Sequence, residues 1–153
     1  MNQHWPVAEP DAVARLHALA AGVRGASVTE GVVDAPYARV WAHLADLEKG
    51  FGDVEPDMRR FTVLSNENGR LEALAVSRYG MRARLRGTLR PGWCWLQSRF
   101  LLIGVAAAPD GPERTRVAFT GGVRVPGRAA LIPLGVRQSG RRSLRLLQRR
   151  MQG

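Results

Sequence analysis

Residues 81–107 read MRARLRGTLRPGWCWLQSRFLLIGVAA, and their hydrophobic pattern indicates neighbouring strands of an antiparallel sheet. From 81 to 90, apolar residues and a glycine alternate with arginine and threonine, which predicts a half-buried strand with a cationic outer face. Pro91-Gly92 is a turn signal, and a second strand is expected from Trp93 to Ser98. The run 100–107 carries no polar side chain, so we expect a strand that is covered on both faces.

The same period of two extends on both sides of this stretch. Asn68-Gly69 separates two short apolar segments and is a strong hairpin signal, and the sequence 109–112 (PDGP) marks a further turn before a last strand from Thr115 to Val123. Residues 27–33 are rich in β-branched side chains and predict one more strand near the N-terminus. Strands about ten residues apart with tight turns indicate an antiparallel meander.

Three segments show helical spacing instead. Asp11 is a candidate N-cap for a helix over 12–23, and residues 37–47 carry apolar side chains at i, i+3, i+4, i+7 and i+10. A long last helix is expected over 132–151, with one apolar stripe and arginines elsewhere. The stripe consists of Ile132, Val136, Gly140, Leu144, Leu147 and Met151. A helix of this kind must lie across the sheet to bury its stripe.

Length, cysteine content and charge narrow the class of protein. The chain has 153 residues, enough for one domain, and its single cysteine excludes an internal disulfide, so the cytoplasm is the expected location. The net charge is +10, and it is uneven: residues 1–77 carry −4 and residues 78–153 carry +14. Such a field suits an acidic partner, of which an anionic membrane surface is one example.

The segment Val33-Asp34-Ala35-Pro36, followed by Val40-Trp41 and Leu44-Ala45-Asp46, resembles the opening of the START/Bet v1-like (SRPBCC) superfamily, in particular its polyketide cyclase/dehydrase and lipid transport branch. The resemblance covers residues 26–152. It implies an α+β helix-grip fold, in which a curved antiparallel β-sheet of about seven strands wraps around a long C-terminal helix. We therefore expect an N-terminal extension with one short helix over 1–25 and a ligand-binding domain over 26–153.

The resemblance also implies a cavity between the sheet and the last helix, where a small hydrophobic molecule would bind. Candidate lining residues come from the apolar face of the arginine-rich strand, from the tryptophan strand and from the helix stripe. They are Met81, Leu85, Trp93, Trp95, Val136, Gly140 and Leu144.

Two of these assignments have open alternatives. Trp93 and Trp95 point to one face of their strand, where they would line the pocket, fill the core, or lie outside against the N-terminal helix or a second subunit. Gly140 either makes room for a ligand beneath the helix or permits close packing of helix on sheet.

No catalytic motif is present, and Cys94 has no base assigned to it, so whether the protein is an enzyme is left open. No metal and no cofactor are expected. The first hypothesis is binding, transport or sequestration of a lipid-like or polyketide-like ligand. The alternatives are a polyketide aromatase/cyclase that uses the same cavity, and a basic docking module for ribosome, RNA or an anionic membrane contacted through the arginine-rich last helix. Nucleic acid is not the expected partner, because the sequence shows charge but no recognised nucleic-acid-binding motif and no aromatic-studded basic groove.

Overall fold

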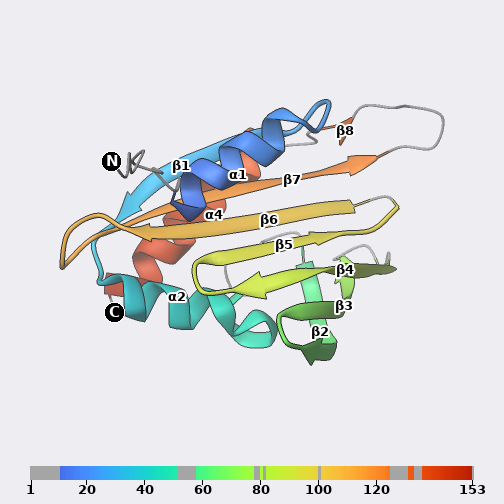
Figure 1. Cartoon of the computed structure of the whole chain (residues 1–153), viewed down its shortest axis with the longest axis horizontal. Helices are drawn as coiled ribbons and strands as arrows, with labels where there is room; N and C mark the ends of the chain where they lie inside the picture. Colours follow the sequence, from blue (N-terminus) through green and yellow to red (C-terminus); the bar gives the residue numbers. More distant parts are fainter. Residues whose placement is uncertain are drawn as a thin grey trace, which may run out of the picture.

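The computed structural model describes residues 11–51, 58–77, 80, 82–99, 101–124, 131–132 and 136–152. Its centre is one antiparallel sheet in the order β1-β7-β6-β5-β4-β3-β2, with the short β8 paired to β7 (Figure 1). The strands are β1 (Ser27–Val33), β2 (Met58–Glu67), β3 (Arg70–Ser77), β4 (Arg82–Arg90), β5 (Trp93–Gln97), β6 (Leu101–Pro109), β7 (Thr115–Arg124) and β8 (Leu131–Ile132). The predicted meander of about seven strands is confirmed, and β1 closes it by pairing with β7.

The hairpins form where the turn residues predict them. Asn68 and Gly69 both have positive φ, 53° and 84°, as the two central residues of a type I′ turn require. Gly92, with φ of 75°, turns β4 into β5, and a Cβ there would lie 2.7 Å from the carbonyl oxygen of Ala107. Only glycine fits this second turn without strain.

Helices cover the two faces of the sheet unequally. The helices α2 (Tyr37–Ala45) and α4 (Val136–Gln152), together with the π-helical turn η1 (Leu47–Phe51), lie on one face, which we call the inner face. The helix α1 (Ala12–Ala21) lies on the opposite, outer face, over β6, β7 and β1 (Figure 1). The sheet therefore has two apolar layers, and β6, buried on both sides from Leu102 to Ala108, is the strand that both layers share.

The last helix begins later than its apolar spacing predicts. It starts at Val136, and Ile132 is not helical but pairs with Val123 as part of β8. Ile132 precedes a proline, and the residue before proline is sterically biased towards extended backbone. The expectation of a helix over 132–151 is wrong at Ile132 and confirmed from Val136 onward, while 133–135 lie outside the described residues.

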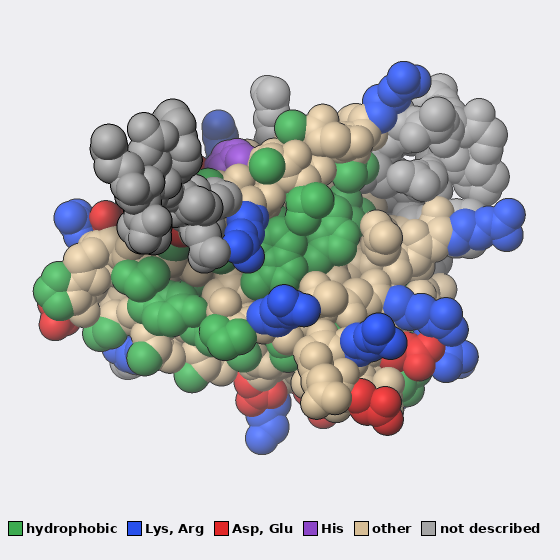
Figure 2. Space-filling view, in the orientation of Figure 1, with side chains coloured by type: hydrophobic (Ala, Val, Ile, Leu, Met, Phe, Trp, Pro, Cys, Tyr) green, Lys and Arg blue, Asp and Glu red, His purple; other side chains and the backbone are tan. Residues whose placement is uncertain are grey.

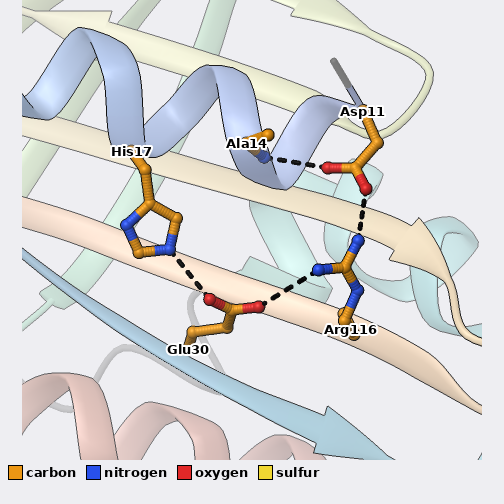
Figure 3. A network of polar contacts seen from close by, with 5 residues as sticks. All are labelled: Asp11, Ala14, His17, Glu30 and Arg116. Atoms are coloured by element: carbon orange, nitrogen blue, oxygen red, sulfur yellow. Dashed lines mark hydrogen bonds and ion pairs between the residues drawn. The ribbon is translucent and has the colours of Figure 1, made fainter. Parts of the chain in front are cut away.

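A chain of polar contacts fastens α1 to the sheet (Figure 3). Asp11 caps the helix by accepting a hydrogen bond from the Ala14 N–H at 2.8 Å, and its other oxygen pairs with Arg116 of β7. Arg116 also pairs with Glu30 of β1 at 3.5 Å, and Glu30 contacts His17 Nε2 at 2.8 Å. This series of contacts begins at the N-cap of α1 and ends at His17 within the helix. It therefore restrains both the position and the rotation of α1 on the outer face of the sheet.

Candidate functional site

The inner face of the sheet is the candidate site, and its wall is apolar. Alternate residues of β3, β4 and β5 face inward and are buried: Leu71, Ala73, Ala75, Leu85, Cys94 and Leu96. They belong to one cluster with residues of α2 and α4, including Val40, Leu44 and Leu147. A ligand bound against this wall would meet hydrocarbon and one thiol.

Many side chains of this wall are short, so they extend only a little way from the inner face of the sheet. Ala75 pairs with Ala83 across β3 and β4, Ala73 pairs with Leu85, and Leu71 pairs with Gly87. Ala83, although on the inner face, keeps part of its surface exposed. Short side chains at successive positions leave more volume above the sheet than leucine or phenylalanine would leave.

The C-terminal helix lies towards one side of this wall. α4 contacts β1 and β7, at the opposite end of the strand order from β2, β3 and β4. Its Leu144 lies against Gly31 of β1, and its Gln148 donates a hydrogen bond to the Val32 carbonyl at 2.8 Å. The helix is thus fixed to the β1 edge of the sheet. The short side chains of β3 and β4 lie nearer the opposite edge, several strands away.

Several polar atoms are buried near this apolar layer. Thr115 donates from Oγ1 to the carbonyl of Ala35 at 2.8 Å and so ties β7 to the loop before α2. Ser27 Oγ, on the inward-facing register of β1, and His43 Nε2, on α2, are buried without a hydrogen-bond partner among the described residues. On spacing alone, four residues after Arg39 and three before Asp46, His43 is expected to be a solvated residue of the helix surface. That expectation is wrong for its Nε2 atom, which is buried. Buried polar atoms are normally paired, so these two are open to a further donor or acceptor.

Cys94 faces the inner layer from β5 and is 2% exposed. Burial raises the pKa of its thiol to about 12, because the thiolate would lose its hydration there. The group is therefore neutral across the physiological range and is a small apolar element of the wall. The same cause raises the pKa of Tyr37, which packs beside the cluster from α2.

The predicted site residues separate into three groups. Leu85, fully buried, belongs to the inner cluster, and Leu144, partly buried, packs against it. Val136 and Gly140 lie in the first turns of α4, with side-chain surroundings outside the described part, and Met81 lies outside the described residues altogether.

Trp93 and Trp95 lie on the other side of the sheet, so their assignment to the inner cavity is wrong. They pack in the outer cluster with Val13 and Leu16 of α1, while Cys94 and Leu96 occupy the inward positions of β5. Their rings are parallel within 7°, with centroids 6.1 Å apart. Of the three placements that the sequence left open, the outer one against the N-terminal helix is found.

Gly104 of β6 has no side chain, and this lets α1 pack closely against the outer face of the sheet. A Cβ there would lie 2.7 Å from Thr120 Cγ2, 3.1 Å from Leu16 Cδ1 and 3.1 Å from Trp95 Cε3. The outer layer is thus packed closely around a backbone position that carries no side chain.

No helix of the described part of the chain is long and apolar enough to span a bilayer.

Comparisons by sequence find no family model and no curated protein that matches this chain. Comparison of structures does find relatives of the fold. The ZhuI aromatase/cyclase from Streptomyces sp. R1128 matches with a TM-score of 0.64 at 19% identity, over 83% of this chain and 93% of that one. A START superfamily protein from Mycobacterium smegmatis matches with a TM-score of 0.59 at 14% identity, over 83% and 97%.

A third match is the di-domain aromatase/cyclase BexL of the BE-7585A biosynthetic pathway, with a TM-score of 0.59 at 17% identity over 81% of this chain and 45% of that one. Identities this low establish the fold and leave the chemistry open. An antiparallel sheet with a C-terminal helix on its inner face, shared with these structures, shows that the chain has the START/Bet v1-like helix-grip fold.

Proposed function

We propose that the protein binds a small hydrophobic molecule, lipid-like or polyketide-like, between the inner face of the sheet and α4. One observation carries the proposal: the inward wall of β3 and β4 is apolar and built from short side chains, while α4 is fixed over β1 and β7. The fold is that of aromatase/cyclases and START proteins. Within this proposal, residues 26–153 form the binding domain, 1–25 are an extension, and the protein acts in the cytoplasm.

A largely apolar ligand would need at least one polar contact to bind tightly. Burial of about 300 Å² of apolar ligand surface would contribute about 7 kcal/mol before association costs. Those costs are at least about 4 kcal/mol, so hydrophobic contact alone supports only weak to moderate binding. Ser27 Oγ and His43 Nε2, buried and unpaired, are the described atoms that could add a polar contact.

Of the predicted lining residues, we retain Leu85 and Leu144, which lie in the inner cluster. Met81, Val136 and Gly140 are proposed as lining residues from the sequence pattern alone. Trp93 and Trp95 lie on the outer face and do not line this site.

The test is displacement of a neutral apolar dye, N-phenyl-1-naphthylamine, from the purified protein, with native mass spectrometry of the same sample. A neutral probe avoids attraction to the arginines, and binding by apolar burial persists at high salt. We expect saturable dye fluorescence at both 50 mM and 500 mM salt, and displacement by fatty acids or flat polycyclic ketones. The absence of dye binding and of any co-purified mass would contradict the proposal.

A second candidate is an aromatase/cyclase reaction in the same space, and the unpaired His43 Nε2 is the observation in its favour. Imidazole is the side chain best suited to proton transfer near neutral pH. This candidate predicts cyclisation of a poly-β-ketone by the wild type and at least a hundredfold loss in His43→Gln, with dye binding unchanged. Dye binding without any turnover would support the binding function and contradict the enzymatic one.

Contact with an anionic membrane through α4 is a further proposal, because the helix presents exposed arginines at 141, 142, 145, 149 and 150. Each well-placed arginine contributes about 1 kcal/mol near an anionic surface. Sedimentation with phosphatidylglycerol vesicles at low salt, lost in a variant with three of these arginines replaced by glutamine, would support it. Equal sedimentation of both proteins would exclude it.

A further inference from the structure

The outer face of β2, β3 and β4 is strongly cationic. α1 lies over β6, β7 and β1, beside these strands. By the strand register, the described outward charged side chains of β2, β3 and β4 are six arginines and two glutamates. They are Arg60, Arg70, Arg82, Arg84, Arg86 and Arg90, with Glu67 and Glu72. All six arginines are exposed.

One glutamate balances part of this charge. Glu72 accepts from Arg84 Nε at 2.7 Å and from Arg86 Nε at 3.3 Å, and the hydrogen bond from Arg84 is the main cause that lowers the pKa of its carboxyl. The side chains of Arg84 and Arg86 stay 63% and 78% exposed in these pairs. The face keeps a clear cationic excess.

The two tryptophans border this cationic face on the strand beside it. In the register of β4 and β5, Arg90 lies opposite Trp93, Thr88 opposite Trp95, and Arg86 opposite Gln97. Trp93 Nε1 donates to Thr88 Oγ1 at 3.2 Å, so its indole is fixed towards β4. Figure 2 shows the face that carries α1, with an apolar area at the centre, Lys and Arg side chains below it and to its right, and some Asp and Glu side chains among them.

Arginines on alternate residues of one strand are about 7 Å apart along the strand, and strands are about 5 Å apart. This face is therefore a lattice of guanidinium groups with two parallel, half-buried indoles at its border. A partner that suits both features offers anionic groups at a short repeat together with flat rings. A single-stranded nucleic acid has one phosphate and one base per nucleotide, and proteins that bind it combine basic tracks with aromatic stacking.

We infer that the outer face of β3, β4 and β5 binds single-stranded nucleic acid, with phosphates at the arginines of β4 and a base at the Trp93–Trp95 pair. A bilayer suits the face less well, because arginines and apolar side chains are interspersed across it: Leu74 lies opposite Arg84 and Val76 opposite Arg82. The inference is independent of the proposed ligand cavity, which lies on the other side of the sheet.

The experiment measures binding of a 5′-labelled 12-nucleotide oligo-dT and oligo-U by anisotropy between 50 and 200 mM salt. Three phosphate contacts predict affinity that falls about 20-fold over this range. The variant Arg82→Gln/Arg86→Gln/Arg90→Gln should bind at least tenfold more weakly at 50 mM salt and lose most of the salt dependence. The matched control is Arg141→Gln/Arg145→Gln/Arg149→Gln, which removes the same charge from exposed positions of α4.

Tryptophan fluorescence gives a separate measurement of stacking. In a Trp5→Phe/Trp41→Phe background, Trp93 and Trp95 are the only tryptophans left to emit. Saturating oligonucleotide should quench this emission, since bases stack on indole. Three results would overturn the inference: no binding at 50 mM salt, equal weakening in both triple variants, or binding to phosphatidylglycerol vesicles through this face without binding to oligonucleotide. Dye binding on the inner face should be the same in the two triple variants, since both sets of arginines are exposed.

Discussion

Leu144 of α4 lies directly on the backbone of Gly31 in β1: a Cβ added to residue 31 would be 2.2 Å from Leu144 Cδ2. Real Cβ atoms do not approach a neighbour so closely, so a side chain at 31 must displace the leucine. This contact fixes the C-terminal helix to one edge of the sheet, together with the hydrogen bond from Gln148 to Val32. The position of the helix over the inner face therefore depends on a glycine.

Gly31→Ala is predicted to destabilise the protein by about 1–3 kcal/mol, because the methyl group overpacks the contact with Leu144. In the Leu144→Ala background the same change should cost much less, since the space it needs is then free. Urea unfolding of the four proteins of the cycle gives the coupling energy, which we expect to be about 1 kcal/mol or more. Strict additivity would show that the two residues do not touch in solution.

Leu16→Ala is predicted to cost about 2–5 kcal/mol, because Leu16 is fully buried between α1 and the outer face of the sheet. Leu19→Ala on the same helix is the control, since Leu19 is 48% exposed, and it should change the free energy of unfolding by less than about 0.5 kcal/mol. Similar losses for the two variants in thermal unfolding would mean that α1 does not dock in this rotation.

The buried thiol of Cys94 predicts an alkaline loss of stability. Its pKa rises from 9.0 to about 12 on folding, so the folded state favours the neutral thiol. This contribution is fully present below pH 9 and is lost as the pH rises from 9 towards 12. Cys94→Ala lacks this contribution, so its free energy of unfolding should fall less than that of the wild type over this interval. Parallel pH curves for the two proteins would contradict the assignment, as would rapid alkylation of the native thiol at pH 8.

Most of the fold can be predicted from the sequence because its patterns are local. The alternation in 82–90, the Asn68-Gly69 turn and the apolar run of β6 each specify a strand or a turn without tertiary information, and all are confirmed. The predicted start of the last helix is not confirmed. Helical apolar spacing extends back to Ile132, but the proline that follows Ile132 favours an extended backbone there.

The face occupied by Trp93 and Trp95 shows a different difficulty. Both faces of β5 are apolar, so alternation alone does not tell which one is inner. A usable signal was present: Pro91-Gly92 is a two-residue turn, so Arg90 and Trp93 must lie opposite each other, and opposite residues share a face. Since Arg90 points outward, Trp93 and Trp95 do too. No comparable signal marks the burial of His43 Nε2, which depends on how α2 packs.

The substitution Ala75→Leu distinguishes an inner face that encloses space from one that is filled. Ala75 is 5% exposed and lies between Phe61 and Ala83 on the inner wall. Ala38→Leu, which adds the same atoms at an exposed position of α2, is the control. If the space exists, Ala75→Leu leaves the free energy of unfolding within about 0.5 kcal/mol of the wild type and abolishes binding of N-phenyl-1-naphthylamine. If the interior is filled, Ala75→Leu instead lowers the free energy of unfolding by about 1–3 kcal/mol through overpacking, and its dye binding does not differ from that of Ala38→Leu. That result would contradict ligand binding on the inner face.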